Sequence, residues 1–327
     1  MLKPRNSIAR RTIDIMPLYT KRLELLQDNP MLKIISSLSL FLLLFLNFAP
    51  VCAQQAPAAI YVDPPPDKEF PAAMEAPNVI SHGSRINAVF FLASAKGPHP
   101  TILLMHGFPG NEKNQDLAYA ARRAGWNVFM PHYRGSWGSD GKFSFSNAIE
   151  DTQIAVEFLR DPASVQKYHI DPRKIVLVGH SMGGFMVAYV TAHDPAIAGL
   201  AMISAWNIGE AMSGPKETHR VDTFPAASVR LAGTTAAGLQ QEAEDNALRW
   251  NYVDYAPAIK DRPVLILESD DRNKMQNHAM AEALGKAGNA RVTEIHLETD
   301  HTYSDHRIAL QVAILNWLQA NFQSSAK

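Results

Sequence analysis

The chain has 327 residues, of which 46% are hydrophobic and 19% are charged, an ordinary composition for a globular protein. Its length fits one large α/β domain or two smaller ones. The formal net charge of -1 provides no basic surface that could gather phosphate groups, which argues against nucleic acid as a partner.

The first 53 residues are expected to form a signal peptide that is not part of the fold. Residues 34–49 read IISSLSLFLLLFLNFA, and small residues follow where a secretory peptidase would cut, which predicts cleavage after Ala53. Met31, Leu32 and Lys33 would make a compact, positively charged start, so we expect translation to begin at Met31, with a mis-assigned start upstream. A membrane anchor is the less favoured alternative, because the apolar run is shorter than the roughly 20 residues that span a bilayer. The mature protein would be secreted or periplasmic, without stable membrane insertion.

The single cysteine, Cys52, lies before the predicted cleavage site. The mature chain therefore cannot contain a disulfide. For the same reason, no cysteine can act as its nucleophile or as a metal ligand.

Residues 54–77 are rich in Pro and Ala and are expected to form an extended arm or linker. Beyond them, a single domain at 78–327 alternates short apolar runs with helical stretches. Strands are expected at residues 88–93, 101–105, 127–130, 174–178, 200–203, 263–267 and 291–297, and helices at 116–124, 147–160, 184–193, 278–287 and 306–322. Most strand runs are apolar without alternation, which is typical of strands covered on both faces. We therefore predict an α/β fold with a mostly parallel, doubly wound sheet.

Residues 205–260 interrupt this alternation with segments rich in Gly, Pro, Thr and Ala and with one helical stretch near residues 240–250. We interpret the interval as a short helical lid inserted over one edge of the sheet. Its aromatic residues Trp206 and Trp250 are candidates for substrate binding. Bulky aromatic side chains in an insertion also commonly form its own small core, and this alternative remains open.

A serine lies between glycines where the strand predicted at 174–178 ends. Gly179, Ser181 and Gly183 fit the pattern G-x-S-x-G, and a predicted helix follows. The glycines let strand and helix approach closely, and the turn presents the serine hydroxyl at the carboxyl edge of the sheet. The amides at the helix N-terminus favour a developing negative charge there. The pattern alone occurs by chance about 0.1 times in a chain of this length, so the flanking strand and helix make it specific.

A serine hydroxyl becomes a nucleophile at neutral pH only beside a general base, and the base needs a group that orients it. Asp270 and Asp271 follow one predicted strand, and His301 follows the next. Both loops leave the carboxyl ends of strands, where Ser181 also lies, so a parallel sheet could bring the three groups together. The order Ser, Asp, His along the chain is the triad order of one known fold.

Residues 79–318 resemble the α/β-hydrolase superfamily, in particular its dienelactone-hydrolase and prolyl-oligopeptidase-like branch. The motifs that carry the resemblance are HGFPG at 106–110, HYRGSWGSDG at 132–141, GHSMGG at 179–184, SDD at 269–271 and DHTYSDHR at 300–307. The resemblance implies the α/β-hydrolase fold with a sheet of about eight strands. It also implies a Ser-His-Asp triad that needs no cofactor, and an oxyanion hole made by the backbone N–H groups of Phe108 and Met182.

The resemblance assigns Ser181 as the nucleophile, His301 as the general base and then acid, and Asp271 as the orienting carboxylate. The loop ESDDRN departs from the family pattern, because it lacks the usual glycine and is a residue shorter. Asp270 therefore remains an alternative to Asp271 as the triad acid.

Three other histidines and one arginine have competing interpretations. His106 in HGFPG and His180 beside the serine are more naturally structural. His306 falls at the start of the last predicted helix, where a capping or surface role is more natural than catalysis. Arg134 could bind a substrate carboxylate or serve as a structural hydrogen-bond donor.

No metal or cofactor is expected. Several potential metal ligands crowd one region, namely His296, Asp300, His301, Asp305 and His306. The three histidines are five residues apart, which does not match a helical pair of the H-E-x-x-H type. The sequence also contains no phosphate-binding loop of the G-x-x-x-x-G-K-[ST] type.

Together these features predict a secreted serine hydrolase that cleaves a small-molecule carboxylic ester through an acyl-enzyme. A serine peptidase acting on short peptides is the alternative, because the motifs also resemble the peptidase-like branch. A non-catalytic binding protein on a hydrolase scaffold is a minor alternative, which the complete set of triad residues opposes. No feature of the sequence predicts an oligomeric state.

Overall fold

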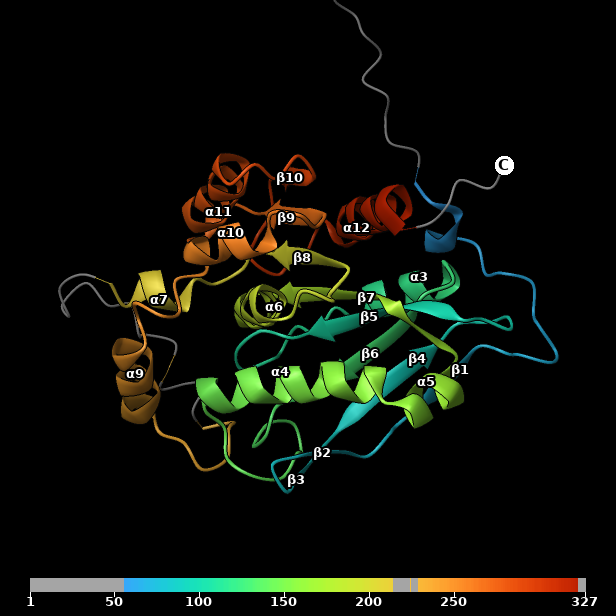
Figure 1. The fold of residues 1–327 in the computed structure, drawn as a ribbon, viewed down its shortest axis with the longest axis horizontal. Coiled ribbons are helices and arrows are strands. Elements are labelled where there is room, and N and C mark those ends of the chain that lie inside the picture. The colour runs from blue at the N-terminus through green and yellow to red at the C-terminus, as the bar shows by residue number, and fades with distance from the viewer. Residues whose placement is uncertain (1–55, 214–223, 225–228, 323–327) are drawn as a thin grey trace, which may run out of the picture. The chain divides into compact units, whose positions relative to one another are not determined.

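The framework of the protein is an eight-stranded sheet (Figure 1), seen in a computed structural model that describes residues 56–213, 224 and 229–322. The strands lie in the order β1-β4-β6-β5-β7-β8-β9-β10, and β2 and β3 form a separate two-stranded sheet. β4 pairs antiparallel with β1 and β6, and the neighbours from β6 to β10 are parallel. The prediction of an α/β fold with a mostly parallel sheet is confirmed.

The elements have the following bounds. The strands are β1 (Ala73–Glu75), β2 (Val79–Ser81), β3 (Ser84–Ile86), β4 (Ala88–Leu92), β5 (His99–Met105), β6 (Asn127–Pro131), β7 (Ile170–His180), β8 (Gly199–Ile203), β9 (Val264–Glu268) and β10 (Val292–His296). The helices are η1 (Ala58–Ile60), α3 (Gln115–Arg123), α4 (Phe145–Arg160), α5 (Pro162–Tyr168), α6 (Met182–His193), α7 (Ile208–Ala211), α9 (Ala236–Asp245), η3 (Tyr252–Tyr255), α10 (Ala256–Ile259), α11 (Lys274–Lys286) and α12 (Arg307–Phe322).

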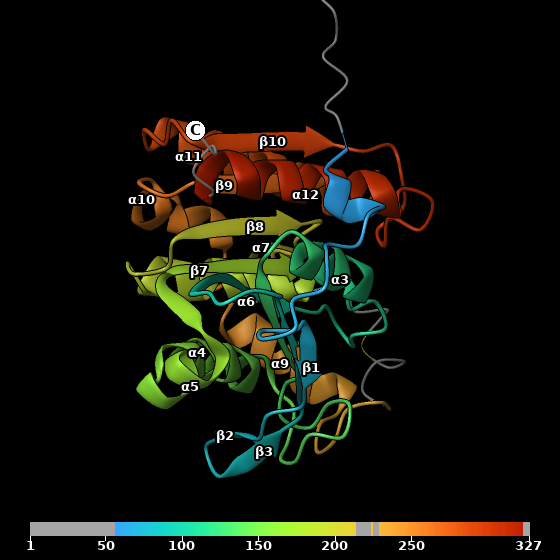
Figure 2. The same cartoon turned by 90° about the vertical axis from the view of Figure 1, so that its right-hand side faces the viewer.

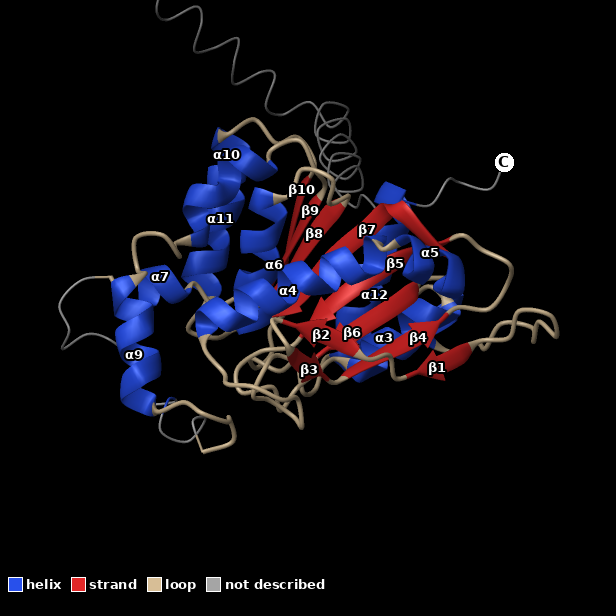
Figure 3. Cartoon of the chain, turned by 60° about the horizontal axis from the view of Figure 1, so that its bottom comes forward, coloured by secondary structure: helices blue, strands red, loops and turns tan. Residues whose placement is uncertain are grey.

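Helices cover both faces of the sheet, and each face has its own core (Figure 3). Leu103 of β5 and Leu177 of β7 belong to the core that includes residues of α4 and α6. Their neighbours Ile102 and Val176 belong to the second core, with α3 and α12. Successive side chains of a strand point to opposite faces, so a strand that is buried on both sides must be apolar throughout. This requirement explains the unbroken apolar runs in the sequence.

The carboxyl ends of the parallel strands β7 to β10 all lie on the same side of the sheet. Figure 2 shows β10, β9, β8 and β7 following one another from the top of the view. The loops that follow β7, β9 and β10 carry the three residues expected to form the triad. The fold therefore directs all three loops to the same edge, as in other open α/β sheets that bind ligands there.

The segment expected to be an arm, residues 54–77, is attached to the domain at several places along its described part, residues 56–77. The Arg123 side chain donates hydrogen bonds to Ala59 O (2.5 Å) and Ile60 O (3.2 Å). Farther along, β1 adds to the edge of the main sheet by pairing with β4. This Pro-rich stretch thus runs along α3 and ends in the sheet.

The segment expected to be a lid, residues 205–260, contains α7, α9, η3 and α10, and its residues 214–223 and 225–228 lie outside the described part. η3 and α10 pack against α6 and α11. Trp250 and Tyr252 are buried in the larger core. The last third of this segment is therefore an integral layer of the domain.

The predicted signal peptide lies outside the residues that the structure describes. The same holds for the cleavage site after Ala53, the expected start at Met31, and Cys52. In the described part of the chain, no helix combines the length and the hydropathy needed to cross a membrane.

Candidate active site

The turn between β7 and α6 holds Ser181 in a strained backbone conformation. β7 ends at His180 and α6 begins at Met182, so a single residue makes the turn. Ser181 has φ 56° and ψ -120°, a region that costs a residue other than glycine about 1–3 kcal/mol. Its N–H donates to Ile203 O (2.9 Å), and its carbonyl accepts from Trp206 N–H (2.9 Å). These two hydrogen bonds, to the end of β8 and the loop beyond it, hold the turn in place.

The glycines on either side of the serine are required by close contacts between backbones. A β-carbon on Gly179 would lie 2.1 Å from Gly183 O, and one on Gly183 would lie 2.2 Å from Met105 O of β5. Ordinary contacts of a β-carbon begin at 3.4 Å, so neither position accepts a side chain without a shift of the backbone. The pattern G-x-S-x-G is thus explained by the packing of β7, α6 and β5.

The two amides expected to form an oxyanion hole lie on segments that flank the serine. Gly107 lies directly beside Ser181, because a β-carbon added to it would be 2.9 Å from Ser181 Cβ. Phe108 is the next residue of that loop. Met182 is the first residue of α6, and the first amides of a helix have no acceptor within the helix. Both N–H groups therefore belong to the immediate surroundings of the serine.

Asp271 and His301 are in direct contact. Asp271 Oδ2 lies 2.5 Å from His301 Nδ1, and Asp271 also accepts a hydrogen bond from Asn273 N–H (2.8 Å). Burial raises the pKa of Asp271, but the hydrogen bond and charge of His301, with the Asn273 amide, outweigh burial and hold this pKa below its usual range. Asp271 is therefore an ionised carboxylate at neutral pH, as the orienting partner of a histidine must be.

The alternative acid, Asp270, points to different partners. Its Oδ1 lies 3.1 Å from His296 Nε2 and 3.2 Å from Lys274 Nζ. Its side chain is about half exposed, whereas that of Asp271 is buried. Of the two neighbouring aspartates, the geometry joins Asp271 to His301.

His301 lies against the serine turn through His180. His180 Nε2 is 2.8 Å from His301 O, and the two rings are 4.7 Å apart between centroids. A carbonyl oxygen only accepts hydrogen bonds, so His180 Nε2 carries the proton. The residue before the serine thereby ties the histidine loop to the end of β7.

Three other histidines, His106, His180 and His306, are poor candidates for a general base. Burial lowers the pKa of His106 to about 4, and burial with the nearby His301 lowers the pKa of His180 to about 3. An efficient general base has a pKa near the working pH, so both side chains are better suited to structural roles. His306 Nδ1 contacts Asp305 (2.9 Å) just before α12, as expected for a surface residue at a helix start.

Arg134 is part of a buried ion-pair network. Its Nε donates to Asp151 Oδ1 (2.6 Å), and its Nη2 donates to Glu150 Oε2 (2.5 Å) and to Asn147 O (3.0 Å). A guanidinium with these partners is a structural donor, and the geometry favours this interpretation over a contact with a substrate carboxylate.

Sequence reasoning missed the residues that join the loops to one another. Ser204, after β8, hydrogen-bonds to Ser269 of the Asp271 loop (2.8 Å) and to Tyr303 of the His301 loop (3.0 Å). All three side chains are buried. No local pattern marks such a contact, but the proximity of Ser269 and Tyr303 to the predicted triad residues was a usable signal.

Arg307 is a second residue of this kind. Its Nη1 donates to Thr302 O (2.8 Å), its Nε to Asp116 Oδ2 (2.9 Å) and its Nη2 to Asn114 Oδ1 (2.9 Å). The guanidinium thereby connects the residue after His301 to the start of α3. Arg307 is the last residue of the motif DHTYSDHR, and its place in this motif was the only indication of its role in the sequence.

Comparison with known proteins agrees with this architecture. A family model described as "alpha/beta hydrolase fold" matches residues 100–232. EstE1, a thermophilic and thermostable carboxylesterase cloned from a metagenomic library, has a similar structure with a TM-score of 0.58 and 17% identity, covering 81% of this chain and 92% of EstE1. The chain has the α/β-hydrolase fold. The predicted resemblance is confirmed.

Two further relatives show how far the likeness extends. Pyrococcus horikoshii acylaminoacyl peptidase gives a TM-score of 0.60 at 16% identity, over 79% of this chain and 42% of the peptidase. The alpha/beta hydrolase domain-containing protein WAV2 of Arabidopsis thaliana is 32% identical over 117 residues, which are 35% of this chain and 36% of WAV2. The matched region spans about a third of the length of the first curated relatives. The structural likeness, at these identities, shows the fold alone.

The two tryptophans proposed for substrate binding lie in an aromatic cluster next to the oxyanion loop. Both Trp206 and Trp250 are buried, and both pack against Phe145, with ring centroids 5.8 and 6.1 Å away. Phe108 joins the cluster through Phe145 (5.7 Å) and Trp206 (6.3 Å). The tryptophans thus support the wall beside Phe108, and their burial favours the core role over direct contact with a substrate.

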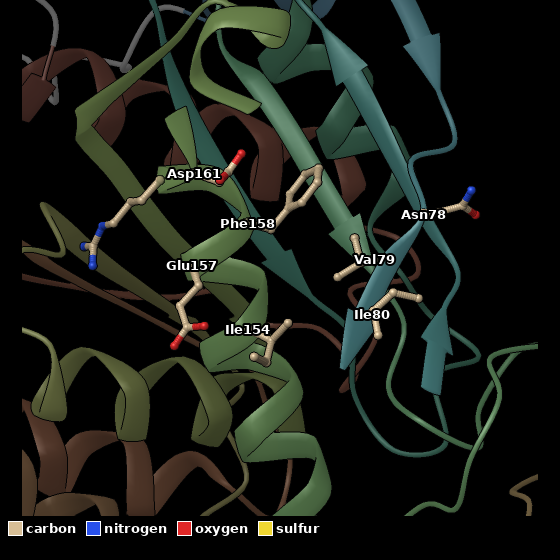
Figure 4. Close-up of a pocket in the computed structure, with 8 residues that line it drawn as sticks. Asn78, Val79, Ile80, Ile154, Glu157, Phe158 and Asp161 are labelled. Carbon is tan, nitrogen blue, oxygen red and sulfur yellow. The ribbon is translucent and has the colours of Figure 1, made fainter. Parts of the chain in front are cut away.

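A separate cleft of about 510 Å³ lies between β2 and α4 (Figure 4). Val79 and Ile80 line it from β2, and Ile154, Glu157 and Phe158 line it from α4. None of the residues predicted for the triad or the oxyanion hole lines this cleft. It is therefore distinct from the candidate active site.

Replacing Gly183 with alanine is expected to destabilise the protein by about 1–3 kcal/mol or more, because the new methyl group meets the backbone of β5. Urea denaturation of the purified variant measures the loss. Gly285→Ala on α11 is the matched control: its methyl group would have nothing within 4 Å, so it should be neutral or stabilising by about 0.5–1 kcal/mol. Equal stability of Gly183→Ala and wild type would refute the packing argument.

Proposed function

We propose that this protein is a serine hydrolase that cleaves carboxylic esters, with Ser181 as nucleophile, His301 as general base and Asp271 as the orienting carboxylate. The observation that carries the proposal is the 2.5 Å contact of Asp271 with His301, beside the strained turn of Ser181. Backbone strain of this kind is concentrated at functional sites, which supports the assignment. The α/β-hydrolase fold supports it independently.

In the proposed reaction, His301 Nε2 takes the proton of Ser181 Oγ while this oxygen bonds to the ester carbonyl carbon. His301 then gives the proton to the departing alcohol oxygen as the ester C–O bond breaks, which leaves an acyl group on the serine. A water molecule repeats the sequence: it gives a proton to His301 and attacks the acyl carbon, and the serine recovers a proton. Asp271, held on Nδ1, stabilises the imidazolium form in each half.

Negative charge on the carbonyl oxygen is stabilised by the N–H groups of Phe108 and Met182 in this proposal. The position of Met182 at the start of α6 adds the favourable field of the helix N-terminus. Each such donor typically contributes about 10²–10³-fold to the rate of acyl transfer. The mechanism requires no cofactor.

The ester substrate is favoured over a peptide by the extent of one structural match. This chain covers 92% of EstE1, a carboxylesterase, and 42% of the acylaminoacyl peptidase. Peptidase activity on short peptides remains the second candidate, because the peptidase matches with a TM-score of 0.60. The signal-like run at residues 34–49 supports a secreted or periplasmic location.

Ser181→Ala should reduce turnover of an activated aryl ester by about 10⁶-fold, because no other nucleophile replaces the hydroxyl. Hydrolysis followed by absorbance of the released phenol measures the effect. Ser146→Ala, at an exposed serine of α4, is the control and should retain wild-type activity. Substantial activity in purified Ser181→Ala would defeat the assignment.

The two aspartates give a matched pair of variants. Asp271→Asn should lower kcat by about 10³–10⁴-fold, because the amide favours the wrong tautomer of His301. Asp270→Asn should leave kcat nearly unchanged, because that side chain faces His296 and Lys274. Steady-state kinetics on the same aryl ester test both variants. The reverse ranking would make Asp270 the triad acid.

A substrate panel separates the candidate activities. Aryl esters of increasing acyl length should be cleaved with higher kcat/KM than aminoacyl or prolyl amides of the same leaving group. A preference for the amides would favour the peptidase. A purified, folded protein that cleaves neither, and that a fluorophosphonate does not label at Ser181, would instead be a binding protein on this scaffold.

A further inference from the structure

Three potential metal ligands converge beside the loop that carries Asp271. Glu268 is the last residue of β9, Glu294 lies on β10, and His278 lies on α11. One ligand atom of each side chain lies within 4.8 Å of the others. The cluster is separate from the proposed triad and takes no part in the reaction described above.

The fold explains why these three side chains meet. β9 and β10 are parallel neighbours in which Glu294 pairs with Ile266 and His296 pairs with Glu268. Residues two apart on a strand point to the same face, so Glu268 and Glu294 share one face of the sheet. α11 packs on β9 and β10 and brings His278 to the two carboxylates.

The two carboxylates lie close together, and one oxygen of Glu268 has no hydrogen-bond partner among the described residues. The Glu268 side chain is 5% exposed, and its Oε1 is buried with no hydrogen-bond partner in the described part of the chain. Glu294 Oε1 is engaged by His278 Nδ1 at 2.7 Å. A buried carboxylate oxygen without a donor is costly, and it needs either a proton or a cation.

The neighbouring cationic side chain is engaged elsewhere. Lys274 Nζ contacts Asp270 (3.2 Å) and His296 (3.3 Å). The arrangement is therefore one that attracts a positive ion into the space between the two glutamates.

We propose that Glu268, His278 and Glu294 bind a divalent first-row transition-metal ion, Zn²⁺ or Mn²⁺. One imidazole nitrogen and two carboxylates form a donor set that suits these ions. Ligand atoms around Zn²⁺ lie about 3.3 Å apart, so the side chains need to move by only about 1 Å from their present positions. His278 is half exposed, which gives an ion access and leaves room for water as a further ligand.

The ion has a structural consequence. It joins α11 to β9 and β10 immediately before Ser269 and Asp271, at the point where the chain leaves the sheet. Metal binding therefore stabilises the domain and the start of the acid loop. The site is independent of the proposed esterase activity, so either proposal can fail without the other.

The test is calorimetric titration of the purified, EDTA-treated protein with ZnCl₂ and, separately, MnCl₂. Wild type should bind one ion of at least one of these metals per chain at this site, with a rise in Tm of about 5 °C at a hundredfold excess over Kd. Glu294→Gln and His278→Asn should each weaken this binding at least tenfold and remove most of the rise in Tm. Glu294→Gln also relieves the repulsion between the carboxylates, so it should be as stable as wild type in EDTA.

His82→Asn is the matched control. His82 and His278 have the same side-chain exposure, 52%, and each lies near a glutamate, but the partner of His82, Glu150, is also bound by Arg134. His82→Asn should bind the ion as wild type does. The proposal is overturned if wild type shows no saturable binding of either metal, or if Glu294→Gln and His278→Asn bind as tightly as His82→Asn.

Discussion

The close approach of β7, α6 and β5 is the constraint on which the rest of the site depends. It is possible only because Gly179 and Gly183 have no side chains, since a β-carbon at either would press on backbone atoms at 2.1 or 2.2 Å. The approach forces Ser181 into a positive φ and leaves it as the one residue between strand and helix. The position of the hydroxyl is thus a result of backbone packing, and the strain is balanced by hydrogen bonds to the end of β8 and to the loop beyond it.

The proposed reaction needs the loops that carry Asp271 and His301 as well as the serine turn. Buried polar contacts hold these loops in place. Ser204 links the loop after β8 to Ser269 and Tyr303, and His180 donates to the carbonyl of His301. Hydrogen bonds in a buried setting favour one geometry, because breaking any of them leaves an unpaired group. Loops that are distant along the chain are therefore held together in one arrangement at the carboxyl ends of the strands.

Much of the fold was predictable, because strands buried on both faces must be apolar throughout, and this leaves a strong signal in the sequence. Some elements leave no such signal. β1 is three residues long with no fully buried side chain. α6 begins at Met182, two residues before its predicted start, because its first-turn glycines resemble a turn in the sequence.

In the candidate site, Ser181 and His301 follow from motifs, but the choice between the two neighbouring aspartates depends on how the loop after β9 turns. Arg307 depends on a contact with Asp116, 191 residues away along the chain, which no local pattern encodes.

The histidines show how environment separates residues of one type. His106 and His180 are buried, and burial lowers their pKa values to about 4 and about 3, because a charged ring loses its hydration. They remain neutral at physiological pH and serve as fixed hydrogen-bond donors to backbone carbonyls. The His301 side chain is 37% exposed, and its Nδ1 contacts the buried carboxylate of Asp271. The proposed general base is thus a histidine that lies between solvent and a buried carboxylate, whereas His106 and His180 are enclosed by the protein.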